Sequence, residues 1–103
     1  MPNYEHLFDS LIAREDDVSP GVMMREPALK CNGKVFMFYY EAKEAMCFKL
    51  GKNFPIEEHG VSEYSHLNPF KNKPPMMAWY LVGGEYEETW DRLAESALTS
   101  MRD

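Results

Sequence analysis

The stretch LKCNGKVFMFYYEAKEAMCFKLG, residues 29–51, decides the fold. Asn32-Gly33 is the strongest short hairpin signal in the chain, because a type I′ turn needs positive φ at both central positions. This dipeptide predicts a strand ending at Cys31 and a second strand over 34–40. After a four-residue turn, a third strand covers about Ala45 to Leu50 and ends before Gly51. We therefore expect a three-stranded antiparallel meander.

The two turns set the register of the meander, and directly opposed residues share one face of a sheet. One face is apolar apart from a phenol, and we expect it to form the core: Val35, Met37, Tyr39, Met46, Phe48 and Leu50. The other face is aromatic but includes a lysine: Leu29, Phe36, Phe38, Tyr40, Cys47 and Lys49. A strand with one solvated face should alternate, yet 35–40 is apolar at six successive positions. The second face therefore needs a cover.

The segments before the meander predict one helix and one strand. Apolar residues recur at helical spacing from Tyr4 to Ile12, which indicates an amphipathic helix ending near Arg14 or Glu15. A strand should follow over about 22–31, interrupted at Pro27, which cannot donate a ladder hydrogen bond and therefore indicates an edge strand or a bulge.

The segments after the meander predict further short elements. FPIEEHG, residues 54–60, fits one short helix with proline at its start and glycine at its end. Residues 61–75 are irregular with room for a short strand, and 76–82 is a continuous apolar run that predicts a buried strand. An apolar helical stripe begins at Tyr86 and continues to Met101.

Together these elements predict one α+β domain over residues 1–103, with two layers and a mainly antiparallel sheet of four or five strands. Two long helices cover one face of such a sheet. An apolar face left open on a monomer tends to mark an interaction site. The possible interaction surface consists of Leu29, Phe36, Phe38, Tyr40, Lys49, Phe70 and Lys71.

Three covers for the second face stay open at this stage. The chain's own segments, with 61–75 folded over the sheet, are the first. A homodimer through this face or through a sheet edge is the second. A groove for another protein or a small ligand, between the sheet and 61–75, is the third.

The order of these elements resembles the TfoX N-terminal domain family, which is related to the YjbR/MmcQ-like group. The motifs that carry the resemblance are Met23 or Met24, Asn32-Gly33, Val35-Phe36-Met37-Phe38, Phe48-Lys49-Leu50, Pro69-Phe70 and Met76-Met77-Ala78-Trp79. The resemblance implies a fold of the order α-β(3)-α-β(1–2)-α. Where the family often has Met-Phe-Gly-Gly, this chain has Met24-Arg25-Glu26-Pro27. Full-length TfoX proteins regulate competence and carry a second domain beyond the part that this chain resembles.

Charge and composition exclude several function classes. The formal charge of −6 argues against direct nucleic-acid binding, which needs clustered Lys and Arg, and against an anionic membrane surface. No run of 18 apolar residues is present to span a bilayer. The first residues, MPNYEHLFDSL, lack the basic and apolar regions of a secretory signal, and two cysteines make no disulfide framework. We expect a cytoplasmic protein with free thiols.

The sequence offers no convincing catalytic, metal or cofactor site. His59 and His66 lie near several glutamates, but their spacing matches no standard zinc pattern. Cys47 lies mid-strand and fits a small buried apolar residue better than a nucleophile. Glu15-Asp16-Asp17 fits a solvated turn better than an acid–base pair. We therefore expect no enzyme and no cofactor, but a non-enzymatic interaction or regulatory module that acts as a homodimer through its apolar sheet face. The alternative is a small-molecule-binding domain that uses the groove beside 61–75.

Overall fold

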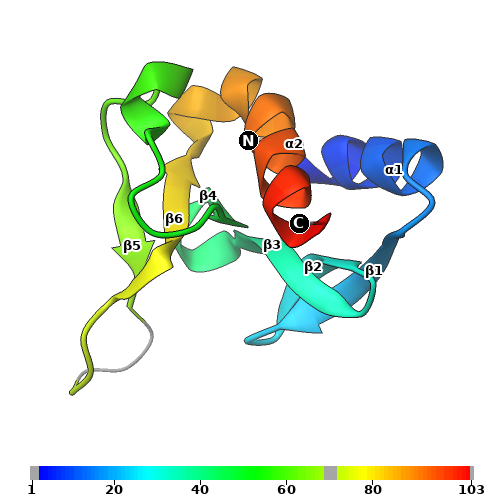
Figure 1. Ribbon diagram of the computed structural model, residues 1–103, viewed down its shortest axis with the longest axis horizontal. Helices are drawn as coiled ribbons and strands as arrows, with labels where there is room; N and C mark the ends of the chain where they lie inside the picture. The colour runs from blue at the N-terminus through cyan, green and yellow to red at the C-terminus, as the bar shows by residue number, and fades with distance from the viewer. Residues whose placement is uncertain (1–2, 69–71, 103) are drawn as a thin grey trace.

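A computed structural model describes residues 3–68 and 72–102. In chain order the helices and strands are α1 Tyr4–Arg14, β1 Val18–Met23, β2 Glu26–Cys31, β3 Lys34–Tyr40, β4 Ala45–Lys49, β5 Ser65–Leu67, β6 Met76–Gly83 and α2 Trp90–Arg102. Three short 3-10 segments connect them, at Glu41–Lys43, Ile56–His59 and Gly84–Thr89. The α+β class and the antiparallel sheet agree with the sequence expectation (Figure 1).

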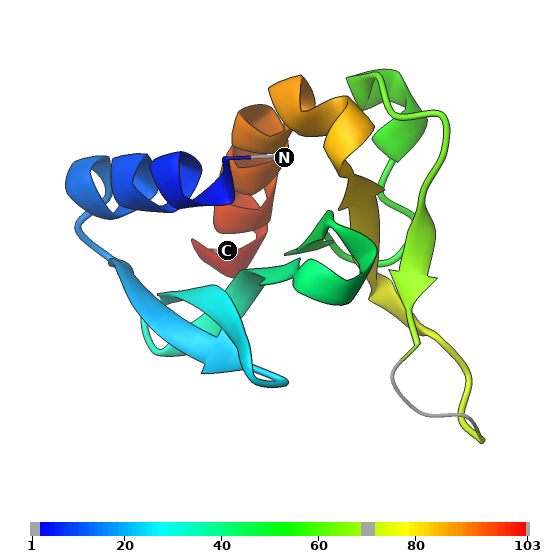
Figure 2. The ribbon, with the colours of Figure 1, turned by 180° about the vertical axis from the view of Figure 1, so that it is seen from behind.

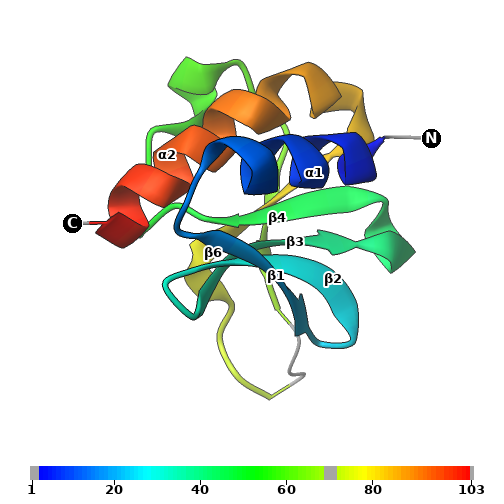
Figure 3. The same ribbon diagram turned by 90° about the vertical axis from the view of Figure 1, so that its right-hand side faces the viewer.

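The sheet has six strands in the described residues, in the order β1-β2-β3-β4-β6-β5, and every neighbouring pair is antiparallel. The expected four or five strands are therefore too few. The long helices pack on the same side of this sheet, as Figure 3 shows. The short helix expected over 54–60 is the 3-10 turn Ile56–His59, which ends at Gly60 with a φ of 87°.

The additional strand arises at the β1–β2 turn. The single strand expected over 22–31 is in fact the second half of a tight hairpin, with Met23 paired to Glu26. The two turn residues, Met24 and Arg25, have φ of 53° and 67°. Residues other than glycine, asparagine and aspartate rarely adopt this left-handed conformation. The sequence therefore gives no hairpin signal where the structure forms one.

The meander follows the expected turns but not the whole expected register. Phe38 pairs with Cys47 and Tyr40 with Ala45, as the turn lengths predict. Between β2 and β3, however, Leu29 pairs with Met37 and Lys30 with Val35, so Phe36 is an extra residue in β3. Such a β-bulge sets two neighbouring residues against one on the partner strand. As a result Phe36 and Met37 both enter the core beneath the helices.

The main core lies between the helices and the sheet. Its members from the meander include Leu29, Phe36, Met37, Tyr39, Met46, Phe48 and Leu50, together with Phe8 and Leu11 of α1 and Trp90, Leu93 and Leu98 of α2. Tyr4 at the start of α1 stacks on Tyr39 with ring centroids 4.3 Å apart. The apolar stripes read from the sequence thus meet the expected face of the meander, with Leu29 and Phe36 added to it and Val35 removed.

A second buried cluster lies on the opposite face of the sheet. It consists of Ala28, Phe38, Ala45, Cys47, Leu67, Trp79 and Leu81. No helix covers this face within residues 3–68 and 72–102, and the β1–β2 hairpin and the start of β6 extend on the side away from the helices (Figures 1 and 2). The two faces are therefore closed by different means.

Candidate interaction surface

The second face of the sheet has a floor that the chain itself buries. Phe38 and Cys47 are fully buried, and Trp79 is 6% exposed. Phe38 packs against Trp79 with ring centroids 5.8 Å apart and against Tyr40 at 5.9 Å. Half-buried residues surround this floor: Met23 from β1, Val35 and Tyr40 from β3, and Ala78 from β6. Partial cover therefore comes from the side chains of the sheet itself.

The predicted interaction residues are distributed over several places. Leu29 and Phe36 lie in the core beneath the helices, so their assignment to the second face was wrong. The bulge in β3 is the reason for Phe36. Phe38 is on the second face as expected, but it is fully buried rather than accessible.

The remaining predicted residues differ in their exposure. Tyr40 and Lys49 are half-buried at the rim of the second face. Phe70 and Lys71 lie outside the described residues. The apolar second face is therefore present, but its rings are buried. The side chains that lie over these rings form the accessible layer of the face.

Methionine side chains form much of this accessible layer. Met76 of β6 is 38% exposed and directly opposes Leu67, which places it on the second face. Met23 packs on the floor from β1, and Met24 in the adjacent turn is 41% exposed. Methionine is flexible and polarizable, which suits surfaces that adapt to a partner. The sequence signal for these residues was the high methionine content, eight in 103 residues.

The β1–β2 turn beside this layer is held in an unfavourable conformation. A residue with a side chain in the left-handed region costs on the order of 1 kcal/mol or more, and both Met24 and Arg25 adopt it. An Asn-Gly pair would form the same turn at lower cost, as Asn32-Gly33 does at the other end of β2. Strained residues of this kind tend to occur at functional sites.

The rim of the second face carries opposite charges at its two ends. The "basic end" is the end with the β2–β3 turn and the exit of β4, and it holds Lys30 and Lys49 on the second face, with the exposed Asp16 nearby at the start of β1. The "acidic end" is the end with the β1–β2 turn, the Glu41–Lys43 segment and the exit of β6. It holds Glu26, which pairs with Met23, and Glu63 and Glu85, which line a groove with Ala45 and Leu81, alongside Arg25 and Lys43. None of these side chains enters an ion pair within residues 3–68 and 72–102.

Lys30 and Lys49 are fixed on the second face by the register. Lys30 pairs with Val35 and Lys49 with Trp79, and both partners contact the second-face cluster. The Lys30 methylenes cross β1 so closely that a Cβ on Gly21 would lie 3.0 Å from them. Both lysines thus cover apolar surface with their stems while their ammonium groups reach the rim.

A groove opens at the acidic end, between the sheet and the segment that leads into β5. It has a volume of about 300 Å³ and is lined by Lys43, Ala45, Glu63, Tyr64, Ser65, Leu81, Gly83 and Glu85. The Glu85 carboxylate folds into the space that a side chain on Gly83 would occupy. A groove between the sheet and 61–75 is therefore present, although its lining residues were not identified from the sequence.

The edges of the sheet are poorly suited to pairing with another strand. The edge strand β1 contains Pro20, which has no N–H to donate, and the other edge strand, β5, spans three residues. Short edge strands and edge prolines are common protections against edge-to-edge association.

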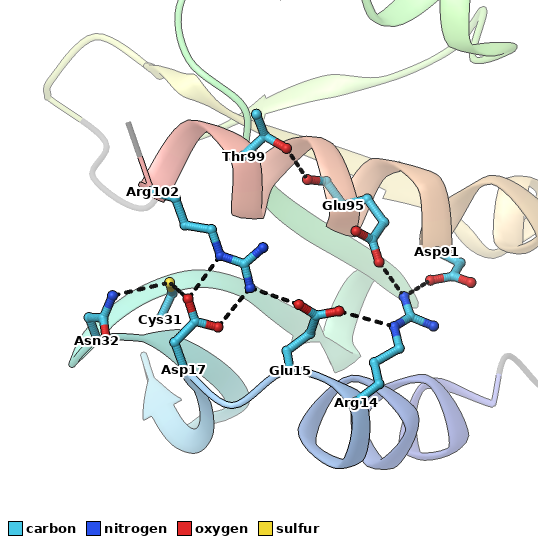
Figure 4. A network of polar contacts seen from close by, with 9 residues as sticks. All are labelled: Arg14, Glu15, Asp17, Cys31, Asn32, Asp91, Glu95, Thr99 and Arg102. Atoms are coloured by element: carbon cyan, nitrogen blue, oxygen red, sulfur yellow. Dashed lines mark hydrogen bonds and ion pairs between the residues drawn. The ribbon is translucent and has the colours of Figure 1, made fainter.

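On the helix side, by contrast, two arginines join neighbouring elements through ion pairs. Arg14 of α1 donates to Asp91 and Glu95 of α2, each at 2.6 Å, and Arg102 of α2 contacts Glu15 and Asp17 at 2.8 and 2.7 Å (Figure 4). Hydrogen bonds from the Arg102 guanidinium lower the pKa of Asp17 to about 2. The network fastens α1, α2 and the start of β1 together, which is a structural role.

The two thiols are free and buried. Burial raises the pKa of the Cys47 thiol. Burial, followed by a hydrogen bond to Asp17, raises the pKa of Cys31, whose Sγ lies 3.5 Å from an Asp17 oxygen. A raised pKa disfavours the thiolate that nucleophilic or metal chemistry requires. Both cysteines therefore behave as packing residues.

The two candidate histidines lie in separate aromatic contacts. His59 stacks on Phe54 with ring centroids 4.8 Å apart. The His66 ring lies 4.6 Å from that of Tyr80, and its Nδ1 is 3.2 Å from the Trp79 carbonyl oxygen. No group of three or more His, Cys, Asp or Glu side chains suited to a metal ion occurs in the described part of the chain.

A smaller cleft of about 240 Å³ lies between α1 and the start of α2, lined by Asn3, His6, Leu7, Ser10, Glu87, Trp90 and Asp91. Trp90 is 1% exposed, and its Nε1 has no hydrogen-bond partner among the described residues. Glu87 accepts a hydrogen bond from the backbone N–H of Asn3 at 2.8 Å, and Asp91 is held by Arg14. The acids of this cleft thus fasten the two helices together.

Comparison of the chain with models of known families, with curated proteins and with solved structures found no match. Among the described residues, none of the helices has the length and apolar character needed to cross a membrane.

Proposed function

We propose that this protein is a non-enzymatic interaction module that associates with a second copy of itself through the second face of the sheet. The observation that carries the proposal is a set of accessible apolar side chains on a face without a helix among the described residues. Met23, Val35, Tyr40 and Ala78 pack on the buried cluster, and Met76 opposes Leu67 of that cluster. The buried cluster gives these side chains a rigid support.

Three features of the structure support this use of the face. The layer is ringed by charged side chains that have no ion-pair partner in the described chain, as is common at the polar rim of an interface. The adjacent β1–β2 turn is strained at Met24 and Arg25. The sheet edges, finally, are blunted by Pro20 and by the shortness of β5, which favours association through the face.

The test is sedimentation velocity over a concentration series, with Met76→Asp as the disrupting variant. Met76 is exposed enough for aspartate to be tolerated by the fold, whereas a carboxylate buried in an apolar interface is costly. We expect a concentration-dependent dimer for the parent chain and a monomer for Met76→Asp.

Val22→Asp is the matched control. Val22 is 70% exposed and lies on the same side of β1 as Val18, which packs beneath the helices. We expect this variant to associate like the parent chain. A dimer that survives Met76→Asp, or one that both variants disrupt equally, would reject this face as the contact.

The groove at the acidic end favours a second candidate function, the binding of a small molecule. Lys43, Glu63 and Glu85 place both charge signs around an apolar wall formed by Ala45 and Leu81. This combination suits a small zwitterion, such as a free amino acid. The test is a thermal-shift screen of the twenty amino acids on the parent chain and on Ser65→Trp, which fills the groove. Stabilisation of the parent chain alone supports the binding function, and no stabilisation rejects it.

We also propose kinship with the TfoX N-terminal domain family, on the motifs given above. The resemblance implies three strands after the first helix, whereas four strands precede the Ile56–His59 turn, so the support for kinship comes from the positions of the motifs alone. Asn32-Gly33 forms a hairpin turn, Val35–Phe38 lies in β3, and Met76–Trp79 begins β6. A structure of a family member with the strand order β1-β2-β3-β4-β6-β5 would support the kinship, and a different strand order would reject it.

A further inference from the structure

We infer that the two copies stack face to face with their strands antiparallel, so that the basic end of each copy covers the acidic end of the other. This inference rests on the proposed function and adds the arrangement of the partner. It follows from the charges that remain unpaired on the second face and from the symmetry that a homodimer imposes.

The two ends are far enough apart to act as separate patches. Ala45 and Lys49 mark the two ends of β4, and four residue steps along a strand span roughly 14 Å. This exceeds the screening length of about 8 Å at physiological ionic strength. Each end therefore presents its own charge to a partner.

A two-fold axis can match both patches at once. When the axis lies in the plane of the interface and at right angles to the strands, it reverses the strands of the second copy. In such an isologous contact, residue i meets residue j and residue j meets residue i. Lys30 of each copy then faces the end of β2 that carries Glu26 in the other copy, and Lys49 faces the end of β4 and β6 that carries Glu85. Stacking with parallel strands would instead oppose like charges, which is costly.

The same charges select a second copy over partners of another kind. A uniformly acidic protein would match the lysines at the basic end but would oppose the three glutamates at the acidic end. A uniformly basic protein would do the reverse. A second copy carries both patches at the required separation, together with an identical apolar layer to cover Met76 and Tyr40.

The test uses two charge-reversal variants of the full chain in sedimentation velocity. Lys30→Glu with Lys49→Glu reverses the basic end, and Glu26→Lys with Glu85→Lys reverses the acidic end. Each variant by itself should associate at least tenfold more weakly than the parent chain, because like charges then meet at both ends. An equimolar mixture should recover a dimer at concentrations where each variant is monomeric. Circular dichroism confirms that each variant is folded.

The outcomes separate this inference from the proposed function. Weakening of each variant together with recovery of the parent chain's affinity in the mixture establishes the antiparallel arrangement. Variants that are no weaker than the parent chain, with a mixture that associates more tightly than the parent chain, would indicate parallel stacking and overturn it. If each variant is weakened and the mixture does not recover, or if neither variant is weakened while the parent chain is a dimer, the arrangement is overturned and the docking face stands. If the parent chain is monomeric throughout and Met76→Asp changes nothing, the proposed function fails, and the arrangement fails with it.

Discussion

The two faces of the sheet are both apolar, but their side chains are covered in different ways. On the helix side, α1 and α2 cover the apolar side chains, and the ion pairs of Arg14 and Arg102 join α1, α2 and the start of β1. On the second face the sheet shelters its own rings, and the charges around them have no ion-pair partner in the described chain. Burial of the aromatic rings alone therefore does not show that a sheet face needs no partner. The helix side is covered by two helices that ion pairs hold together, whereas among the described residues the second face is covered only by side chains of its own strands.

The contrast between the two faces requires that the second buried cluster is packed as tightly as the main core. Phe36 and Phe38 are close in β3, face opposite sides of the sheet and are both fully buried. We expect Phe36→Ala and Phe38→Ala each to lower the free energy of unfolding by about 3–5 kcal/mol, because each leaves a large cavity. Urea unfolding of the two variants measures this. A cost below about 1 kcal/mol for Phe38→Ala would show that the second face is only loosely packed.

Relieving the strain at the β1–β2 turn should stabilise the fold, whereas the two phenylalanine substitutions should destabilise it. Replacing Met24-Arg25 with Asn-Gly should raise the free energy of unfolding by about 1 kcal/mol or more, because both positions have positive φ. The same double replacement should weaken self-association if Met24 contributes to the contact. Chemical denaturation and sedimentation of the variant measure the two effects. Lower stability would show that the turn is not strained.

The smallest expected effect concerns the paired charges of the helix side. The Arg102 guanidinium lowers the Asp17 pKa from 3.8 to about 2, so the ionised carboxylate stabilises the fold above about pH 4. This stabilisation should disappear as the pH falls from about 4 to about 2. Melting temperatures over this range should fall less steeply for Arg102→Gln than for the parent chain. Parallel curves would show that the network contributes nothing to stability.

The turns and apolar stripes made much of the fold predictable. Asn32-Gly33 fixed the β2–β3 hairpin, and the spacing of Tyr4, Phe8 and Leu11 located α1 because helical periodicity is a strong signal. The β1–β2 hairpin could not be predicted, because Met24 and Arg25 have no turn propensity. The bulge at Phe36 could not be predicted either, because an unbroken run of apolar residues has no alternation in which an extra residue would be visible.

The candidate surface was predictable only in part. The run of six apolar residues in β3 correctly indicated that both faces of the sheet are apolar. It could not show that the rings of the second face are covered by Met23, Val35, Tyr40 and Ala78, because this cover depends on the side-chain packing of three different strands. The separation of the rim charges into two ends also depends on strand order, which brings β4 beside β6.

The most direct test of the open second face is the sedimentation coefficient of the parent chain as its concentration is raised to about 1 mM, the range in which even weak dimers form. We expect a shift from monomer to dimer that Met76→Asp abolishes and Val22→Asp leaves unchanged. A coefficient that stays at the monomer value over the whole series would contradict the account.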